Sequence, residues 1–590
     1  MIMTTVLDKI NSPRDVKELS MDEVPVLAQD IRDGILNRVK TIGGHLGPDL
    51  GIVEATIAMH YVFDSPIDKF VFDVSHQCYP HKMLTGRKEG FIDKDKLFSI
   101  TGYTNPQESE HDFFTVGHTS TSVSLATGLA KARDLKNEKY NVIALIGDGS
   151  LSGGEAYEGL NNAAVLGSNF IVIVNDNEMS IAENQGGLYK NLELLRETKG
   201  KAELNFFKSI GFDYYYVEEG NNVEALIEAF NQVKDINHPI VVHIHTIKGK
   251  GIPASEKNKE LYHYAMPGWL NEDNEIVLPS SMPETYNSLT ADYILKKKKE
   301  DSTVIAISPA TPGVTGFTQD FRKELGPNYT DVGIAEEHAI AYASGIAKNG
   351  GKPILGIMSS FIQRTYDQLS QDLALNNSPA TILVCWGAIS PMDATHLGIF
   401  DIPLISNIPN IVYLAPTNKE EYLSMLNWSV DQTQYPVAIR MPFGEIISTG
   451  IIDNTDYSKL NKFKVEEIGD TVAILGLGNF FGLGKQVKNE LEKKLGINAT
   501  LINPRYITGC DEELLESLKQ NHKLVITLED GLLDGGFGEK ITRFYGNSEM
   551  KVLNFGAKKE FTDRVPLELL YERYHLTKEL IVQDIKKCIN

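Results

Sequence analysis

Short apolar runs and helical patterns alternate along the whole chain of 590 residues. The runs are rich in Val and Ile and only a few residues long, which predicts buried strands, and the periodic segments between them predict covering helices. The clearest predicted strands cover residues 141–146, 170–174, 240–244, 303–307, 381–384 and 471–475. This alternation predicts an α/β fold with largely parallel sheets.

Two polar, aperiodic stretches divide this pattern into three parts. Residues 253–283 are rich in Pro, Asn and Glu, which predicts a linker, and a helix is expected after it over 288–300. Residues 450–462 mark the second boundary. We therefore expect three α/β domains, over 1–283 with the linker included, 284–455 and 456–590.

Composition and charge narrow the class of protein. Lys and Arg total 57 against 79 Asp and Glu, a net charge of −22, whereas a protein that coats nucleic acid or an anionic membrane needs a basic surface. The sequence shows neither a signal peptide nor an apolar run of about 18 residues. Its four cysteines lie far apart, without zinc or disulfide spacing. We expect a cytoplasmic protein that binds neither nucleic acid nor membrane.

The most specific local signal is the pair of triplets GDG at 147–149 and NDN at 175–177, each of which directly follows a predicted strand. Open α/β sheets bind ligands at the carboxyl ends of their strands. Glycine lets a backbone approach a phosphate, and Asp and Asn supply oxygen ligands to Mg²⁺. The alternative is two turns that happen to be rich in these residues. Together, after two strands, the triplets match the thiamine diphosphate motif.

Three histidines, His45, His76 and His118, lie in loops rich in Gly, Ser and Pro. A single loop histidine is usually a surface or capping residue, but three in glycine-flanked loops favour hydrogen bonding to a substrate or diphosphate. Their spacing does not resemble a zinc site. His60 lies in an apolar run, which favours a packed helix residue.

Glu336 lies in the stretch DVGIAEEHA at 331–339, where apolar residues precede it. This setting predicts partial burial, which raises the pKa of a carboxyl group and favours its neutral, proton-donating form. The alternative is an exposed Glu at a helix start.

These motifs resemble those of the 1-deoxy-D-xylulose-5-phosphate synthase family, within the thiamine-diphosphate transketolase superfamily. The matching blocks run in family order over about residues 10–560: GGHLGPDLGIVE, FDVSHQCYPHKMLTGR, VGHTSTSVSLATGLA, IGDGSLSGGEAYEGLNNA, VNDNEMSI, KGKG, GIAEEHA, SSFIQRTYDQ, DATHLGIFD and LEDGLLDGGFG. The resemblance implies a transketolase-like architecture with bound thiamine diphosphate and Mg²⁺.

The resemblance also implies roles for individual residues. Asp148 and Asn177 resemble the Mg²⁺ ligands, with the Met179 carbonyl as a third. The residues that would surround the cofactor's diphosphate are Gly117, His118, Thr119, Gly149 and Ser150. His76 would lie close to it, and Ile252 would be a further cofactor-binding residue.

The remaining implied roles concern the reaction. Glu336 resembles the glutamate that bonds N1′ of the aminopyrimidine, and Phe361 would stack on that ring. His45 and His396 resemble histidines near the reacting carbonyls. The family reaction joins pyruvate, with loss of CO₂, to the aldehyde glyceraldehyde 3-phosphate.

The sequence departs from the family on the acceptor side. Cys385-Trp386 and Phe443 stand where arginines for the acceptor phosphate are expected, while Arg440 remains. A paralogue that uses an unphosphorylated or different aldehyde is therefore an alternative. An E1-type 2-oxo acid decarboxylase, which would need a lipoyl partner, and a non-catalytic cofactor binder are further alternatives. The resemblance implies a homodimer and a third domain that carries no catalytic group.

Overall fold

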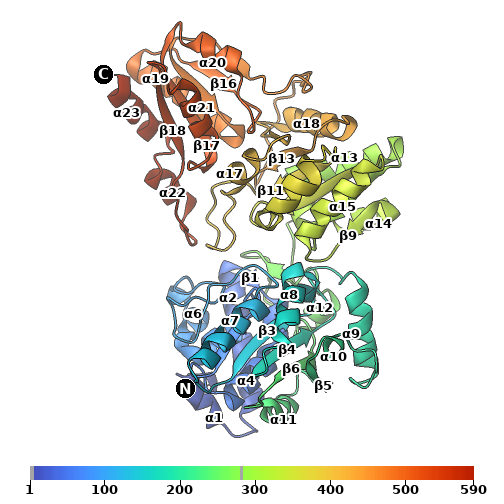
Figure 1. The fold of residues 1–590 in the computed structure, drawn as a ribbon. Helices are drawn as coiled ribbons and strands as arrows, with labels where there is room; N and C mark the ends of the chain where they lie inside the picture. The colour runs from blue at the N-terminus through green and yellow to red at the C-terminus, as the bar shows by residue number, and fades with distance from the viewer. Residues whose placement is uncertain (1–4, 280–282, 590) are drawn as a thin grey trace. The chain divides into compact units, whose positions relative to one another are not determined.

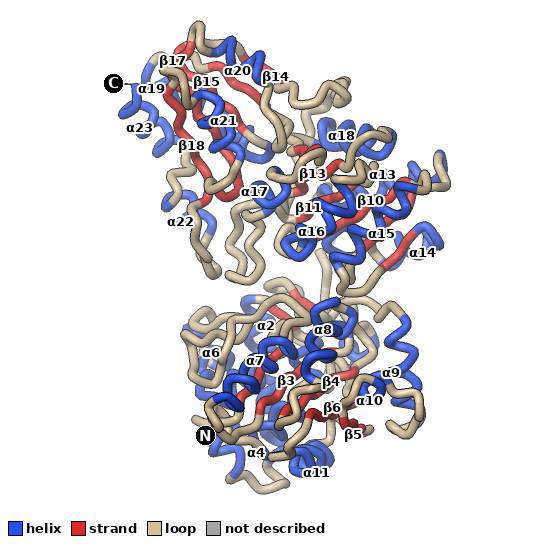
Figure 2. The backbone as a smooth tube through the Cα atoms, viewed as in Figure 1, coloured by secondary structure: helices blue, strands red, loops and turns tan. Residues whose placement is uncertain are grey.

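The computed structural model describes residues 5–279 and 283–589. The chain divides into two compact units, which we call unit 1 (Met1–Ser281 with Gly333–Ala335) and unit 2 (Met282–Val332 with Glu336–Asn590). Figure 1 and Figure 2 show the elements of each unit. Within the described residues, no helix combines the length and the apolar character needed to cross a lipid bilayer.

Unit 1 is built around a five-stranded sheet of order β2-β3-β4-β6-β5, and all its strand pairs are parallel. The strands of the unit are β1 Gly44–His45, β2 Lys69–Phe72, β3 Val142–Gly147, β4 Phe170–Asp176, β5 Asp213–Val217, β6 Pro239–His245 and β7 Tyr264–Ala265. The helices are α1 Pro13–Lys17, α2 Val24–Ile42, α3 Gly47–Gly51, α4 Val53–Val62, α5 Tyr79–Lys82, α6 Glu89–Ile92, α7 Ser122–Leu135, α8 Gly154–Ala163, α9 Gly187–Glu197, α10 Phe206–Ser209, α11 Val223–Val233 and α12 Pro253–Lys257.

The apolar runs of this sheet are continuous because both faces are buried. Ile143 and Leu145 pack with α4 and α11, whereas Val142 and Ala144 pack on the opposite face with α7 and α8 (Figure 1). Successive side chains of a strand point to opposite faces, so a central parallel strand needs apolar residues at every position.

Unit 2 contains two sheets. The first has the order β12-β13-β11-β10-β8-β9 and is parallel throughout, and the second has the order β14-β16-β15-β17-β18 with only β14 antiparallel. The strands are β8 Val304–Ser308, β9 Tyr329–Asp331, β10 Lys352–Met358, β11 Thr381–Cys385, β12 Val412–Leu414, β13 Val437–Met441, β14 Lys464–Glu467, β15 Thr471–Gly476, β16 Thr500–Asn503, β17 His522–Leu532 and β18 Lys551–Ala557.

The helices of unit 2 cover these sheets. They are α13 Tyr286–Glu300, α14 Gln319–Leu325, α15 Glu336–Lys348, α16 Tyr366–Gln368, α17 Asp401–Ser406, α18 Lys419–Asp431, α19 Phe481–Leu495, α20 Glu512–Leu518, α21 Phe537–Tyr545, α22 Leu567–Arg573 and α23 Lys578–Ile589. Helices α19 and α23 pack on one face of the second sheet and α20 and α21 on the other (Figure 2). One apolar cluster joins residues of both sheets, which makes unit 2 a single compact body.

The expected α/β class and the largely parallel sheets are confirmed. All the predicted strands form, as β3, β4, β6, β8, β11 and β15, and the predicted helix forms as α13. Each of the three larger sheets lies inside one of the three expected domain ranges, and the boundaries themselves stay a prediction.

The linker predicted over 253–283 is wrong for the part that the structure describes; residues 280–282 lie outside that part. Tyr262, Ala265 and Leu270 are buried in the core of unit 1, and β7 pairs with β1. The stretch is polar on average, but these apolar residues anchor it to the folded unit. It is therefore a structural part of unit 1.

Candidate active site

The two predicted ligand triplets meet at one edge of the unit 1 sheet. Gly147 of β3 lies opposite Asn175 of β4, and the Asp148 backbone N–H donates to the Asn175 carbonyl at 3.0 Å. Asn175 and Asp176 belong to the end of β4, and Asn177 follows it. The predicted position of both triplets at the carboxyl ends of strands is confirmed.

Two buried carboxyl groups at this edge differ in their partners. Burial would raise the pKa of Asp176, but hydrogen bonds from His243 at 2.9 Å and Arg196 at 2.6 Å lower it to about 2. Burial, followed by the neighbouring Asp176, raises the pKa of Asp148 to about 8, and its Oδ2 accepts from the Asn184 side-chain amide at 2.7 Å. Asp148 is therefore a buried carboxyl group that a bound cation would stabilise in its charged form.

The other two predicted metal ligands share the turn after β4. The Met179 backbone N–H donates to Asn177 Oδ1 at 3.3 Å, and Lys259 Nζ donates to the Asn177 carbonyl at 3.0 Å. Asn177 is buried. The turn thus places an amide oxygen and backbone carbonyls on the same sheet edge as Asp148.

The loop with Gly117, His118 and Thr119 is fixed by a carboxylate that the sequence reading missed. Asp73 directly follows β2 and accepts the backbone N–H of Ser120 at 2.8 Å and of Ser122 at 3.0 Å. Gly117 is buried, and His118 and Thr119 are half-buried. Because Asp73 takes the backbone donors at one end of the loop, it sets the course of residues 117–119.

This loop lies against the turn that holds Gly149 and Ser150. Ser120 Oγ donates to the Ser150 carbonyl at 2.8 Å. A Cβ on Gly153 would lie 2.1 Å from Ser120 Oγ, and one on Gly149 would lie 3.0 Å from Ser180 Cα. A side chain at Gly153 would therefore force Ser120 to move, whereas Gly149 is only tightly packed against Ser180. The structure therefore brings together the residues predicted to bind the diphosphate.

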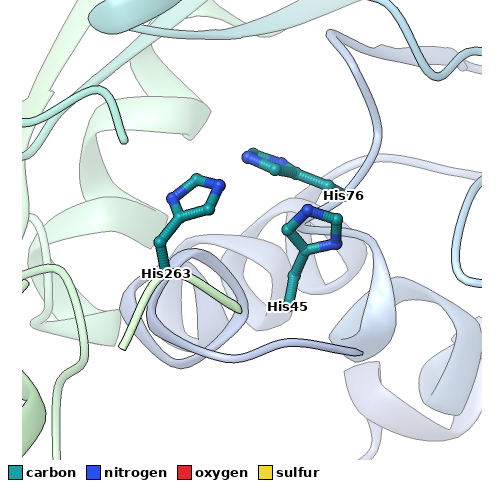
Figure 3. Close-up of side chains that lie close together, drawn as sticks. All are labelled: His45, His76 and His263. Carbon is teal, nitrogen blue, oxygen red and sulfur yellow. The ribbon is translucent and has the colours of Figure 1, made fainter. Parts of the chain in front are cut away.

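Three histidines gather in unit 1, as Figure 3 shows. The ring centroids of His45 lie 4.7 Å from His76 and 5.4 Å from His263. Strand β1 holds His45 beside β7, and the Leu46 N–H donates to the His263 carbonyl at 3.1 Å. Burial lowers the pKa of His76 to about 4 and that of His263 well below its usual range. These two rings are therefore neutral at pH 7 and can exchange hydrogen bonds with a ligand.

A buried lysine from the KGKG block stands next to this cluster. Lys248 Nζ lies 3.1 Å from His263 Nδ1 and donates to the Ser180 carbonyl at 2.5 Å, and burial lowers its pKa to about 7. The nitrogen atoms of the three histidines lie within 4.8 Å of one another, close enough to consider a metal. The Lys248 amine beside them, partly charged at pH 7, favours an anion or a carbonyl oxygen instead. Ile252, four residues after Lys248, is buried in the core of unit 1.

Glu336 begins helix α15 in unit 2 and is buried. Burial raises its pKa, and Arg364, whose Nη1 lies 3.5 Å from Glu336 Oε2, partly offsets this effect. The predicted burial is confirmed. The Glu336 carboxyl group can therefore keep its proton and share it with a hydrogen-bond partner.

Phe361 and His396 come together although they lie on different loops. Phe361 follows β10, and its ring centroid lies 5.6 Å from that of His396 in an edge-to-face arrangement. The His396 Nδ1 is 2.9 Å from the Thr395 hydroxyl, which orients the ring. Unit 2 therefore carries an aromatic ring and a titratable ring side by side.

The acceptor-side departures also cluster in unit 2. Trp386 and Phe443 pack edge to face with centroids 5.2 Å apart. The retained Arg440 is buried between Asp401, at 2.6 Å, and Asp530. Arg440 thus neutralises two buried acids and is engaged inside unit 2.

Sequence reasoning missed Asp73, Lys248 and His263. Asp73 follows a strand and so carried the same signal as Asp148, but the strand 69–72 is short. Lys248 belongs to the KGKG block, which the sequence analysis used only as a family motif without giving this residue a role. His263 lies in the stretch mistaken for a linker, so nothing in its surroundings indicated a fixed position.

Family models match nearly all of the chain. The model described as 1-deoxy-D-xylulose-5-phosphate synthase matches residues 7–205 and 196–246. The transketolase pyrimidine-binding domain matches 285–446, and the transketolase C-terminal domain matches 461–581.

Relatives of the same family are similar over their full length. The 1-deoxy-D-xylulose-5-phosphate synthase of Caldanaerobacter subterraneus subsp. tengcongensis is 37% identical and covers 98% of both chains. That of Symbiobacterium thermophilum is also 37% identical, over 98% of this chain and 94% of its own.

Among solved structures, the transketolase of Campylobacter jejuni subsp. jejuni is 17% identical with a TM-score of 0.44, covering 96% of this chain and 100% of its own. The assignment rests on the sequence matches over the whole chain. The chain belongs to the 1-deoxy-D-xylulose-5-phosphate synthase family, a transketolase-type family of transferases.

Proposed function

We propose that this chain joins pyruvate to glyceraldehyde 3-phosphate with thiamine diphosphate, releasing CO₂ and forming 1-deoxy-D-xylulose 5-phosphate. Family membership over the whole chain supports this reaction. The structural observation that carries it is the buried Glu336 at the start of α15, with its raised pKa.

The residues of unit 1 fit a diphosphate with a metal ion. Asp148, Asn177 and the Met179 carbonyl would supply only oxygen ligands, which suits Mg²⁺. The cation would also stabilise the negative charge of the buried Asp148. Gly117, His118, Thr119, Gly149 and Ser150 would line the diphosphate. Gly153 lies so close to the Ser120 side chain that an added Cβ would displace it, and Gly149 is tightly packed against Ser180.

The remaining cofactor contacts follow from side-chain type. His76 would lie close to the diphosphate, and Ile252 would offer an apolar side chain. Phe361 would stack on the aminopyrimidine in unit 2. Bound thiamine diphosphate supplies a nucleophilic carbon and an electron sink for decarboxylation.

The chain's own residues would manage protons and orientation. Glu336 would hold a proton at N1′ of the aminopyrimidine, and its burial favours the protonated form that this bond needs. His45 in unit 1 and His396 in unit 2 would polarise carbonyl oxygens or transfer protons. In the overall reaction the bond between the carboxylate and carbonyl carbons of pyruvate breaks, and the remaining two-carbon unit bonds to the aldehyde carbon.

The acceptor phosphate would be bound without Arg440, because that side chain is enclosed by Asp401 and Asp530. Trp386 and Phe443 would contribute an apolar surface at the positions where the family carries arginines.

We also propose that the active protein is a homodimer in the cytoplasm. Sedimentation of the purified chain would test the homodimer, and fractionation of cells would test the location.

Assays with purified protein, thiamine diphosphate and Mg²⁺ test the proposed function. We expect pyruvate-dependent CO₂ release and 1-deoxy-D-xylulose 5-phosphate from D-glyceraldehyde 3-phosphate, and less product from unphosphorylated D-glyceraldehyde. A preference for D-glyceraldehyde would favour the paralogue instead. Reductive acylation of lipoamide from pyruvate would indicate an E1-type decarboxylase.

A further inference from the structure

His396 in unit 2 lies on the long loop between β11 and α17. This loop folds back on itself, because Ala388 and Gly398 form an antiparallel bridge. The His396 backbone N–H donates to the Asp393 carbonyl at 2.9 Å. The tip at residues 391–396, which we call the His396 tip, thus forms a compact turn whose placement decides where the imidazole lies.

Both flanks of the His396 tip are anchored in the core around the second sheet of unit 2. Ile389, Leu397 and Ile399 are buried there with residues of β15, β17 and α23. The Leu532 N–H, at the end of β17, donates to the Ile399 carbonyl at 3.1 Å. The loop leaves the first sheet but is packed by residues of the third expected domain, 456–590, which we call the C-terminal third.

Two adjacent residues of the C-terminal third also hold the tip itself. Asp563 Oδ1 accepts the Ala394 backbone N–H at 3.1 Å, and the Arg564 backbone N–H donates to the Met392 carbonyl at 2.9 Å. Arg564 Nε lies 3.7 Å from Asp393 Oδ1. These contacts hold the tip on either side of Asp393, three residues before His396.

The backbone at this point adopts a conformation that is rare for a residue with a side chain. Arg564 has φ +49°, which aims its N–H at Met392. Left-handed backbone costs free energy at a residue other than glycine and persists only where surrounding contacts fix it. The two hydrogen bonds to the tip are contacts of that kind.

We propose that Asp563 is a positioning residue, which together with the Arg564 backbone holds the His396 tip so that the imidazole meets the substrate. The family resemblance implied no catalytic group in the C-terminal third. This part of the chain then affects the reaction by fixing the position of the loop that carries His396. The inference rests on the proposed function for the role of His396, and its structural half stands on the contacts alone.

Hydrogen exchange of the full-length holoprotein tests the structural half without any assay of turnover. In Asp563→Ala we expect the amides of Ala394 and His396 to exchange at least about tenfold faster, because a charge-assisted hydrogen bond is lost. Asp563→Asn keeps an oxygen that accepts the Ala394 N–H and should exchange close to the parent. Glu549→Ala, an exposed carboxylate elsewhere in the C-terminal third, is the control. Unchanged exchange in Asp563→Ala would overturn the inference whether or not the chain is active.

Steady-state kinetics tests the functional half. We expect Asp563→Ala to lower kcat about tenfold or more, with the cofactor Kd unchanged and activity largely restored in Asp563→Asn. In a His396→Asn background the same substitution should lower kcat less than about twofold, because the tip then positions nothing. An equal loss in both backgrounds would mean a general structural effect and would overturn the inference. A parent protein that forms no product would instead contradict the proposed function.

Discussion

Single glycines show how closely the predicted diphosphate-binding segments of unit 1 approach each other. Gly153 has ordinary backbone angles, yet an added Cβ would collide with the Oγ and Cβ of Ser120. Its neighbour Gly154 has open space around it. Steric room, and not backbone freedom, is therefore the reason for glycine at 153.

Gly153→Ala should lower the free energy of unfolding by about 1–3 kcal/mol and weaken thiamine diphosphate binding, because the 117–121 loop has to move. Gly154→Ala is the matched control and should change stability by less than about 1 kcal/mol. Denaturant unfolding and cofactor titration measure both effects. Equal unfolding free energies and cofactor affinities of the two variants would show that the 117–121 loop can move without a loss of stability, contrary to this prediction.

Glu336 should make stability depend on pH in a defined direction. Burial raises its pKa above the ordinary value of 4.5, so the folded protein binds this proton more tightly than the unfolded chain. Its contribution to stability is present below the unfolded pKa and is lost as pH rises through the folded pKa. Above that range, Glu336→Gln should unfold at a higher temperature than the parent when both are free of cofactor.

Melting temperatures between pH 5 and pH 8 test this expectation, with the exposed Glu549→Gln as control. The gain of Glu336→Gln over the parent should grow with pH, and the control should follow the parent. A gain that is constant or that shrinks with rising pH would contradict the assignment of a raised pKa to Glu336.

At the scale of elements, the segment after β6 shows that a polar average can conceal a structural role. Tyr262 is buried, and its hydroxyl accepts the Ile276 backbone N–H at 3.0 Å. Through β7 this segment holds β1, and with it His45 beside His263.

Tyr262→Ala should therefore cost about 3–5 kcal/mol of unfolding free energy, the usual loss for a buried aromatic side chain. Val277→Ala, at an exposed position of the same segment, should stay within about 0.5 kcal/mol of the parent. Chemical denaturation followed by circular dichroism measures both. A small loss in Tyr262→Ala would support the linker interpretation that the structure rejects.

Elements with a local signal could be predicted, and those fixed by distant contacts could not. The strand before Asp148 was predictable because burial on both faces requires a continuous apolar run, and the triplets lie directly at strand ends. Glu336 was predictable from the apolar residues around it. Asp73 and Lys248 had local signals, a strand end and the KGKG block, but their partners Ser122 and His263 are distant in the sequence or lie in the stretch that looked like a linker. His263 had no local signal, because its contacts with His45 and His76 come from remote segments.

At the scale of the whole molecule, a buried ion network ties the two sheets of unit 2 together. Arg440 extends from β13 of the first sheet and pairs with Asp530 on β17 of the second, as well as with Asp401. Removing one partner of a buried pair leaves an uncompensated charge, which is more costly than the pair itself was favourable.

Arg440→Met should lower the unfolding free energy by about 3–5 kcal/mol. The exposed Arg543→Met should change it by less than about 0.5 kcal/mol. Thermal and denaturant unfolding test this, together with KM for glyceraldehyde 3-phosphate. Unchanged stability combined with a strongly raised KM would instead mean that Arg440 binds the acceptor phosphate.

The proposed reaction depends on Glu336 serving the cofactor from its buried position in unit 2. The most direct measurement is the rate of CO₂ release and of 1-deoxy-D-xylulose 5-phosphate formation from pyruvate and D-glyceraldehyde 3-phosphate, for the parent and for folded Glu336→Gln at saturating thiamine diphosphate and Mg²⁺. We expect the parent to form the product and the variant to lose about 10²-fold or more in kcat, the usual size of a proton-transfer contribution. Equal rates in the two proteins, or no product from the parent, would contradict the account.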